Sequence, residues 1–322
     1  IIQGFAAGGE TPLSGYFISL NTASKNRGLY CALVVVSGFI GMLLASAVVC
    51  ALPYCATWVS QLLGKTSMGY LAESWRWPFL LCIPLSLWIY SLRSSLSLMP
   101  SDQTKVHRAL HQKPIAPLLQ AFVLVAFMEV FIYTVLIWLP SYLHSYIGVP
   151  SFDARLTNVM TLLIFSLSMI GAGYATRWMD ASKFVLIGVG SLVLFSYPLF
   201  TLLQSGDFLV LLLTQIAFAI MAGCLVGVIF VVLPDLFKDN WQSLGMTVSY
   251  SLPTAVFGGT APLVCAYLIE VTHLLTAPAL YIVAFGLFAL PVAYHLSLKN
   301  RVKDVPLSGI TADLSGHARA IG

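Results

Sequence analysis

Long apolar stretches alternate with short polar loops along all 322 residues of the chain. The hydrocarbon core of a bilayer is about 30 Å thick, so a helix that crosses it needs roughly 20 mostly apolar residues. A helix also satisfies its own backbone hydrogen bonds where water is absent. The pattern predicts nine spanning helices, at residues 1–20, 28–52, 77–92, 115–143, 156–176, 184–203, 208–233, 244–269 and 277–298.

Composition supports this interpretation. Hydrophobic residues make up 59% of the chain and charged residues 9%, and the mean hydropathy is +0.90. A soluble domain has about 25% charged residues, so a soluble protein is excluded. We therefore expect an all-α, polytopic membrane protein whose first partner is the lipid bilayer. The net charge of +4 gives no indication of nucleic-acid binding, because the basic residues follow the topology of the spans.

Basic residues fall overwhelmingly in every second loop. Thirteen of the 16 Lys and Arg residues lie after the odd-numbered spans, at Lys25, Arg27, Arg93, Lys105, Arg108, Lys113, Arg177, Lys183, Lys238, Lys299, Arg301, Lys303 and Arg319; the opposite side has only Lys65, Arg76 and Arg155. Basic loops stay on the cytoplasmic side. The pattern predicts a cytoplasmic C-terminus and an external residue 1. Residue 1 is predicted to be external and already lies in an apolar segment, so we expect an odd number of further helices upstream.

The longest basic loop divides the predicted helices into three and six. We predict that residues 1–93 are the second half of one six-helix bundle, with 94–114 as a cytoplasmic linker. Residues 115–298 then form a complete six-helix bundle, and 299–322 form a cytoplasmic tail. The outward loop at 53–75 retains apolar residues and is expected to pack on the membrane surface.

Two glutamates lie in the middle of predicted spans, Glu10 in the first and Glu129 in the fourth. Insertion scales put a centrally placed charge at about +2.5 to +3.5 kcal/mol. Each glutamate therefore needs a partner across the bundle, a water-filled cavity or a bound proton. We interpret both as candidates for the substrate and proton pathway, together with Tyr133, one turn after Glu129, and with Tyr250 and Thr254 on the opposite wall. The alternative is a purely structural hydrogen bond.

Glycine and proline interrupt two of the spans. Gly8, Gly9 and Pro12 lie in the first, and Gly258, Gly259 and Pro262 in the eighth. Transporters use interrupted helices to line substrate sites, so these six are candidate gating positions. Close helix packing is the alternative explanation.

Histidine and cysteine spacing predicts neither a metal site nor a cofactor site. His107 and His111 have helical spacing but lie in a basic loop without a third ligand. The six cysteines lie in or beside apolar spans without metal-ligand spacing, and among them Cys50 and Cys55 are the pair to examine for a disulfide.

Four segments resemble a known family, the metabolite:proton symporters of the major facilitator superfamily. This family contains transporters of proline/betaine, citrate, α-ketoglutarate and shikimate. The segments are Gln3-Gly4-Phe5-Ala6-Ala7-Gly8-Gly9-Glu10, similar to the fourth helix; Trp75-Arg76-Trp77-Pro78-Phe79, similar to the entry to the sixth; Trp138-Leu139-Pro140-Ser141-Tyr142-Leu143, similar to the end of the seventh; and Phe257-Gly258-Gly259-Thr260-Ala261-Pro262, similar to the eleventh. The resemblance implies twelve helices in two halves, of which this chain covers helices four to twelve.

Other segments depart from the family pattern. In the family, the cytoplasmic turn after helix eight usually reads Gly-x-x-x-Asp-Arg-x-Gly-Arg. In this chain the turn runs from Gly173 to Lys183 and contains Arg177, Trp178 and Asp180. The Glu-x-Phe-Pro before the next loop is matched to Val231-Val232-Leu233-Pro234, without the acidic residue. These positions belong to the cytoplasmic gating network, so the departures bear on conformational cycling.

The sequence and the resemblance together favour a proton-coupled symporter of a small organic solute, such as proline/betaine or a carboxylate, in a bacterial-type inner membrane. We expect alternating access, a monomer, no cofactor and no enzymatic activity. A non-transporting remnant of such a transporter is one alternative. A membrane-embedded enzyme is the other, but the scattered histidines supply no nucleophile–base pair or metal cluster.

Overall fold

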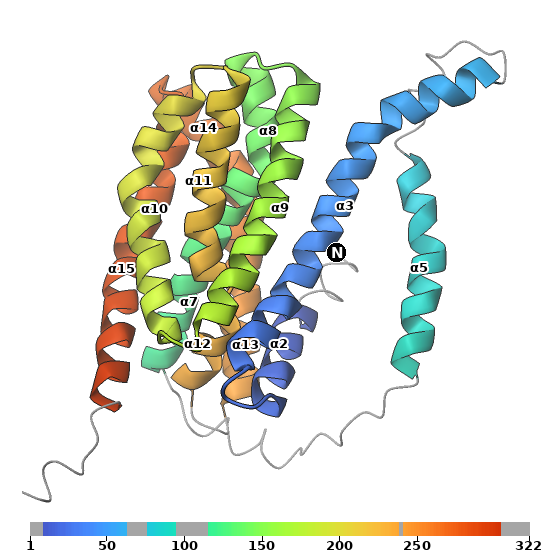
Figure 1. Ribbon diagram of the computed structural model, residues 1–322. Helices are drawn as coiled ribbons and strands as arrows, with labels where there is room; N and C mark the ends of the chain where they lie inside the picture. The colour runs from blue at the N-terminus through green and yellow to red at the C-terminus, as the bar shows by residue number, and fades with distance from the viewer. Residues whose placement is uncertain (1–8, 63–75, 95–114, 238–240, 304–322) are drawn as a thin grey trace, which may run out of the picture.

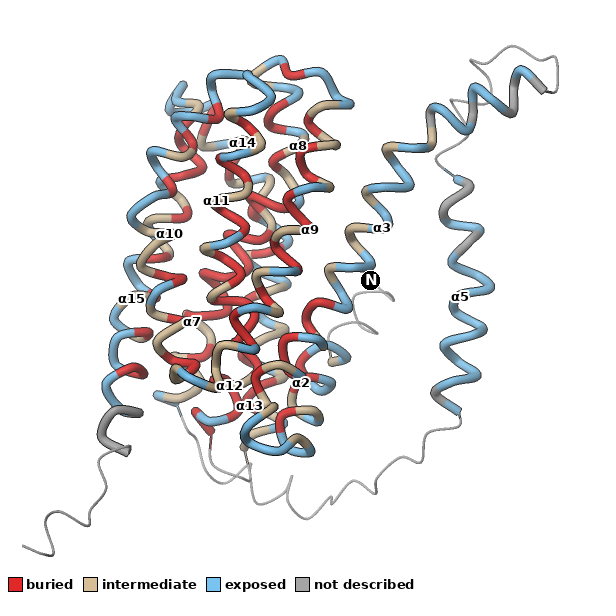
Figure 2. The backbone as a smooth tube through the Cα atoms, viewed as in Figure 1, coloured by how far each residue is buried: buried red, intermediate tan, exposed pale blue. Residues whose placement is uncertain are grey.

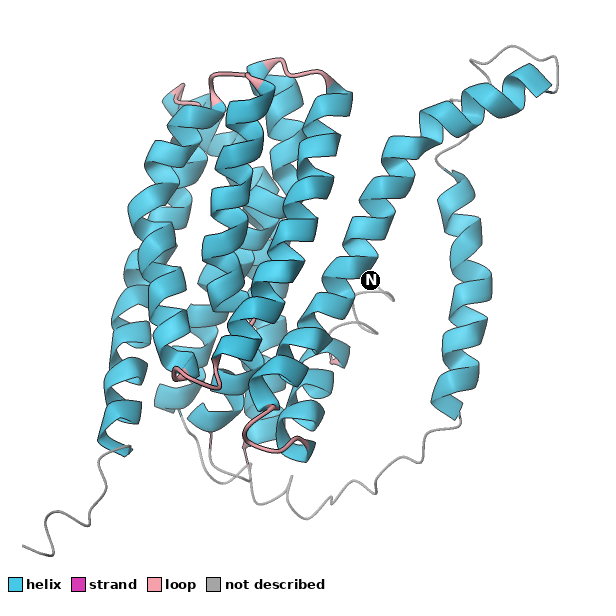
Figure 3. Cartoon of the chain, in the orientation of Figure 1, coloured by secondary structure: helices cyan, strands magenta, loops and turns pink. Residues whose placement is uncertain are grey.

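A computed structural model describes residues 9–62, 76–94, 115–237 and 241–303. The described residues form helices joined by short loops, without a strand among them (Figure 3). Its elements are α2 (Glu10–Asn21), α3 (Arg27–Leu62), α5 (Trp77–Ser94), α7 (Ile115–Phe131), η2 (Ile132–Trp138), α8 (Leu139–Tyr142), η3 (Leu143–Ile147), α9 (Ser151–Ala175), α10 (Ala181–Leu203), α11 (Phe208–Val226), α12 (Ile229–Leu236), α13 (Gln242–Pro253), η4 (Thr254–Gly258), α14 (Gly259–Thr272) and α15 (Ala277–Lys303); η2, η3 and η4 are π-helical.

Seven helical runs in the described residues are long and apolar enough to cross a membrane. They are Arg27–Leu52, Ile115–Ile147, Ser151–Ala175, Ala181–Leu203, Phe208–Leu236, Gln242–Thr272 and Ala277–Lys299. The predicted all-α, multi-pass membrane bundle is confirmed, and these runs match the second and the fourth to ninth predicted spans. The third span corresponds to α5, and the first overlaps α2, although its first eight residues lie outside the described part. Residues 95–114, most of the predicted linker, also lie outside it, as do His107 and His111.

Two helices run further than the sequence pattern predicts. α3 continues to Leu62, ten residues past the predicted end of the second span. The fourth span continues to Ile147, where Gly148 in the left-handed conformation (φ 84°) ends the helix. The second membrane-length run ends at Leu52, as predicted, whereas residues 53–62 of the predicted outward loop are helical.

The helices from α7 to α15 form one tightly packed bundle with α7 at its centre. Leu124, Phe127, Met128, Phe131 and Leu136 on the α7–η2 run are all buried. Figure 2 shows this burial concentrated along the inside of the bundle, with exposed positions on the outside. A helix that is apolar on all sides is expected where it is surrounded by other helices. The buried Glu129 of α7 is therefore surrounded by neighbouring helices.

Helices α2 and α3 pack against one end of this bundle. α3 lies along α9, and α2 contacts α12 and α13. At the closest point of the α3–α9 contact, a Cβ added to Gly28 would lie 2.6 Å from the carbonyl oxygen of Gly173, so both positions need glycine. α3 then leads away from the bundle, and α5 stands apart from it (Figure 1) with its described side chains exposed. The predicted domain boundaries stay predictions.

Candidate functional site

Glu129 is the buried carboxylate of the bundle core. It lies near the end of α7, in a run from Leu124 to Leu136 whose residues, with the exception of Tyr133, are all buried. Its own exposed fraction is 3%. An ionised carboxylate in such surroundings is costly unless other groups hydrogen-bond to it. The position predicted from the sequence as a mid-span carboxylate is therefore a desolvated one in the folded protein.

Two side chains of the neighbouring helix supply those hydrogen bonds. The Thr254 hydroxyl lies 3.0 Å from Glu129 Oε1, and the Tyr250 hydroxyl also hydrogen-bonds to the carboxyl group. Tyr250, in α13, and Thr254, at the start of η4, are four residues apart, so they lie one above the other on the face of the α13–η4 run that packs against α7. The two residues that the sequence placed on the opposite wall are thus brought into contact with Glu129.

Thr254 has a second potential acceptor. Its hydroxyl oxygen lies 2.8 Å from the backbone carbonyl oxygen of Tyr250, as well as 3.0 Å from the Glu129 carboxyl. A hydroxyl group carries one proton and donates to one acceptor at a time. When Thr254 donates to the Tyr250 carbonyl, its oxygen can still accept a hydrogen bond from a protonated Glu129. The arrangement can therefore accommodate the carboxyl group with or without its proton.

Tyr133 lies in the same region, and its ring packs against Gly258. A Cβ added to Gly258 would lie 2.8 Å from Tyr133 Cε2, so the ring occupies the space that a side chain at 258 would fill. Tyr133 lies in the π-helical turn η2, and Gly258 ends the π-helical turn η4. Such turns recur at functional sites because they displace side chains from the regular helical positions. Tyr133, Tyr250, Thr254, Glu129 and Gly258 form one cluster, which we call the carboxylate cluster.

Other candidate residues lie elsewhere. Glu10 is exposed at the first residue of α2, in contrast to the buried Glu129. Gly9 directly precedes that helix, and Pro12 is buried within it. Gly8 lies outside the described residues.

The remaining two gating candidates, Gly259 and Pro262, lie in the first turn of α14. An added Cβ at Gly259 meets nothing within 4 Å, so no close packing explains that glycine. α14 continues as an α-helix past Pro262, which is partly buried. Of Gly258 and Gly259, the first therefore belongs to the carboxylate cluster and the second does not.

A second polar feature, absent from the sequence-based candidates, is an ion pair between α3 and α12. The Arg27 guanidinium donates to both carboxylate oxygens of Asp235, at 2.9 and 3.1 Å, and to the carbonyl oxygen of Val231 at 3.3 Å. Two parallel hydrogen bonds of this kind fix geometry as well as charge. The pair joins residues 208 positions apart, which no local motif reveals. The acidic residue directly after Pro234, on the basic side of the predicted topology, was the available signal.

The loops beside this ion pair are also connected. Arg177, after α9, donates to the side-chain oxygen of Asn26 at 2.8 Å, and its guanidinium lies 4.4 Å from the centre of the Tyr174 ring. Arg177 belongs to the turn that departs from the family pattern. The contact shows that this turn still binds the loop between α2 and α3.

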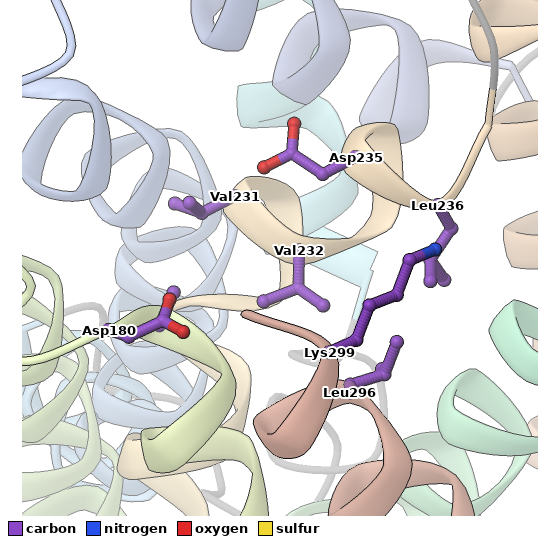
Figure 4. A pocket seen from close by; sticks show the side chains of 8 residues that line it. Asp180, Val231, Val232, Asp235, Leu236, Leu296 and Lys299 are labelled. Atoms are coloured by element: carbon purple, nitrogen blue, oxygen red, sulfur yellow. The ribbon is translucent and has the colours of Figure 1, made fainter. Parts of the chain in front are cut away.

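A small pocket lies next to the ion pair, below α12 (Figure 4). Figure 4 shows Asp180, Asp235 and Lys299 around Val231, Val232, Leu236 and Leu296, with the Lys299 side chain extending toward Leu236. Ala181 completes the lining. We call the end of the bundle that carries Arg27, Arg177 and Lys299 the basic end.

A third polar group lies between α9 and α11. Gln215 donates to Thr157 at 3.0 Å and accepts from Thr161 at 3.1 Å, and all three side chains are buried. These bonds connect two helices with uncharged groups, which membrane helices use to associate. The six cysteines, in contrast, are all free thiols, Cys50 and Cys55 included.

The sequence of this chain is similar to a known protein family and to several curated proteins. A family model described as the Major Facilitator Superfamily matches residues 1–258. The ectoine/proline transporter ProP of Corynebacterium glutamicum is 27% identical over 309 residues, which cover 90% of this chain and 60% of that protein. A putative proline/betaine transporter of Staphylococcus aureus is 26% identical over 318 residues, covering 95% of this chain and 66% of that protein.

A further relative is the glycine betaine/proline/ectoine/pipecolic acid transporter OusA of Dickeya dadantii. It is 25% identical over 341 residues, covering 97% of this chain and 64% of that protein. All three relatives carry the names of transporters and none the name of an enzyme. The chain spans 60 to 66% of the length of these relatives.

Proposed function

The chain belongs to the major facilitator superfamily, and on that premise we propose that it serves in proton-coupled symport of a small zwitterionic solute by alternating access. The family membership implied by the motifs is thereby confirmed. The observation that carries the proposal is the buried carboxyl group of Glu129, which is hydrogen-bonded by Thr254 and Tyr250. Intramembrane carboxyl groups of this kind act in proton relays of pumps and transporters.

The solute class follows from the relatives. Their names include proline, betaine and ectoine, and each of these molecules combines a carboxylate with a positively charged nitrogen. We infer that the solute of this protein is of the same class. Small zwitterions are strongly hydrated, so a path across the bilayer must offer hydrogen-bonding groups that replace water. The carboxylate cluster and the α9–α11 polar group provide such groups inside the described helices.

Glu129 is assigned the role of proton carrier. In its ionised form it accepts hydrogen bonds from Tyr250 and Thr254. In its protonated form it can donate to the Thr254 oxygen, which then donates to the Tyr250 carbonyl, 2.8 Å away. Both forms thus retain partners without any movement of the backbone. Glu10 stays a second candidate, although its exposed position on α2 offers no comparable enclosure.

The basic end is assigned to the cytoplasmic side, because 13 of the 16 basic residues lie on that side of the predicted topology. Arg27–Asp235 and Arg177–Asn26 tie α2 and α3 to the larger bundle at this end. In alternating access, two bundles rock around a central site. The two contacts would then close the cytoplasmic side and would break when the site opens inward.

Uptake of radiolabelled proline and glycine betaine tests the proposal in cells that express the protein, with the proton gradient intact and collapsed. We expect accumulation that is lost when the gradient collapses and that Glu129→Gln abolishes. Glu270→Gln is the matched control, because Glu270 is exposed at the end of α14, and this variant should accumulate solute as the parent does. Accumulation that ignores the gradient, or that survives in Glu129→Gln, would contradict proton coupling through this residue.

A further inference from the structure

The segment α12 is a short helix that continues the run of α11 after a two-residue break. α11 ends at Val226, and α12 begins at Ile229 after a break at Gly227 and Val228. A Cβ added to Gly227 would lie 2.5 Å from the carbonyl oxygen of Met169, so only glycine fits at the break. Val228 has φ −114° and ψ 1°, outside the helical region. α12 is therefore attached to α11 by a kink, and its own contacts determine its position.

Phe230, in the first turn of α12, makes the contacts with the two N-terminal helices. Its ring fills the space beside Gly15 of α2, where an added Cβ would lie 2.5 Å from two ring atoms. Its carbonyl oxygen accepts a hydrogen bond from Cys31 Sγ of α3, at 3.7 Å. Both Phe230 and Cys31 are fully buried. Phe230 is thus a residue through which α12 is seated against α2 and α3.

The same ring reaches the carboxylate cluster on its other side. The Phe230 and Tyr250 rings pack with their centres 5.5 Å apart at an angle of 38°. The hydroxyl of Tyr250, at the far end of that ring, hydrogen-bonds to Glu129. Two side chains in direct contact therefore connect the buried carboxyl group to the surface where α12 meets α2 and α3.

We propose that Tyr250 and Phe230 are positioning residues that couple the protonation of Glu129 to the seating of α12 against α2 and α3. The proposal rests on the proposed function and adds to it the route by which the proton acts on the bundle. Hydrogen bonds to an ionised carboxylate are roughly twice as strong as those between neutral groups. An ionised Glu129 therefore holds the Tyr250 ring, and Phe230 behind it, more firmly than a protonated one does.

Coupling of this kind acts in both directions. When α12 moves away from α2 and α3, Phe230 no longer supports the Tyr250 ring, and Glu129 loses part of the hydrogen bonding that makes its ionised form tolerable. Among the described residues, the other ionisable group that faces Glu129 is the phenol of Tyr133, on the same helix. Thr254 contributes an uncharged hydroxyl. Protonation of Glu129 is thus the charge change available at this point.

Cys31 is a native reporter of the seating of α12, because its thiol is buried against Phe230. The experiment replaces Cys50, Cys55, Cys82, Cys224 and Cys265 by alanine and measures the reaction of Cys31 with a membrane-permeant maleimide in membrane vesicles. A protein that retains only the exposed Cys55 is labelled under the same conditions and gives the reference rate. Dividing the Cys31 rate by this reference rate removes the effect of pH on the reagent itself.

We expect Glu129→Gln to raise the relative reactivity of Cys31 by about tenfold, the effect expected from the loss of hydrogen bonds to a charged group. Tyr250→Phe keeps the ring and removes only the hydroxyl, and it should raise the reactivity similarly. In the Tyr250→Phe and Phe230→Leu backgrounds, adding Glu129→Gln should change nothing further, because coupled residues are non-additive. Tyr267→Phe, at an exposed tyrosine of α14, is the matched control and should match the parent.

Additive effects of Glu129→Gln and Tyr250→Phe would overturn the proposal. So would a Cys31 reactivity that Glu129→Gln leaves unchanged while solute accumulation is lost, since Glu129 would then carry the proton without this route, and the proposed function would stand. If Glu129→Gln leaves both accumulation and Cys31 reactivity unchanged, the proposed function and the coupling route both fail. Parallel changes in accumulation and in Cys31 reactivity across the variants would support both.

Discussion

Glu129 and Thr254 are 125 positions apart in the sequence, yet the carboxyl oxygen of one lies 3.0 Å from the hydroxyl oxygen of the other. The contact is made because α7 and η4 pack side by side in the core of the bundle. It gives the carboxyl group a partner that can accept or donate. A hydrogen-bonding pair with this property, placed in an apolar core, is well suited to holding a proton for a limited time.

Replacement of Thr254 tests this pair directly. Thr254→Val keeps the shape of the side chain but removes the hydroxyl, so Glu129 loses one hydrogen bond. We expect proton-driven uptake to fall by roughly tenfold, the change expected from one hydrogen bond to a charged group. Thr254→Ser keeps the hydroxyl and should retain most of the uptake. The measurement is the initial rate of labelled solute uptake at equal protein in the membrane.

Thr260→Val is the control for the Thr254 variants. Thr260 is exposed, and its hydroxyl donates to the carbonyl of Val256 within the same helical run. Uptake by this variant should equal that of the parent. Equal uptake by Thr254→Val and Thr254→Ser would show that the hydroxyl has no part in proton handling.

The two adjacent glycines of the eighth span should respond differently to the same substitution. In Gly258→Ala the new methyl group would meet the Tyr133 ring at 2.8 Å, which forces the ring out of its place beside the carboxylate cluster. Overpacking of this kind costs about 1–3 kcal/mol. We expect a lower melting temperature in detergent and slower uptake. Gly259→Ala, where the added Cβ meets nothing within 4 Å, is the control and should leave both quantities unchanged.

These glycines also show what the sequence could and could not provide. The apolar run lengths predicted the helices well, because length and hydropathy alone decide whether a segment can cross a bilayer. The four-residue spacing of Tyr250 and Thr254 predicted their shared face, because that spacing is a property of the helix itself. Gly258 and Gly259, however, cannot be distinguished from the sequence alone, because they are adjacent residues of the same type. Only the neighbouring helix, which brings Tyr133 to one of them, makes them different.

Contacts between distant segments lay beyond the sequence for the same reason. Arg27 and Asp235 meet because α3 and α12 come together at the basic end, and neither residue has a partner pattern in its own segment. Glu10 and Glu129 looked alike as mid-span carboxylates, but the fold exposes one and buries the other. The π-helical turns of the fourth span extended it to Ile147, and they depend on packing that hydropathy does not describe.

The Arg27–Asp235 pair should affect conformational balance more than stability. The Asp235 side chain has an exposed fraction of 56%, and exposed pairs contribute about 0–1 kcal/mol. Asp235→Asn should therefore leave the melting temperature nearly unchanged. Because this contact closes the basic end in the proposed cycle, we expect the variant to increase maleimide labelling of a cysteine introduced at Val231.

Exchange of the two charges provides the check on this interpretation. The double variant Arg27→Asp, Asp235→Arg restores an ion pair in the opposite sense and should return the labelling of that cysteine toward the parent level. Arg27→Asp alone places two acidic groups together and should give the highest labelling. A double variant that labels as strongly as Arg27→Asp would show that the pair does not close this end.

The last prediction concerns the contact between α3 and α9. The two helices approach closely there because each has a glycine, whose side chain is a single hydrogen atom, at the contact. A Cβ added to Gly173 would lie 2.5 Å from the Cβ of Ala32 and 2.7 Å from the carbonyl oxygen of Gly28. Neither neighbour can rotate away, since one is fixed to the backbone and the other belongs to it. Gly173→Ala must therefore push α3 away from α9, at an expected cost of about 1–3 kcal/mol.

Gly171 lies two residues earlier in the same helix, and an added Cβ there meets nothing within 4 Å. Because alanine favours helix over glycine by about 1 kcal/mol, Gly171→Ala should stabilise the protein slightly or leave it unchanged. The comparison of the two melting temperatures isolates the helix contact from helix propensity, since both variants add the same methyl group to α9. The displacement of α3 should also withdraw Arg27 from Asp235 and Asn26 from Arg177. Gly173→Ala is therefore expected to raise labelling at the basic end, and equal melting temperatures for the two variants would refute the close contact between α3 and α9.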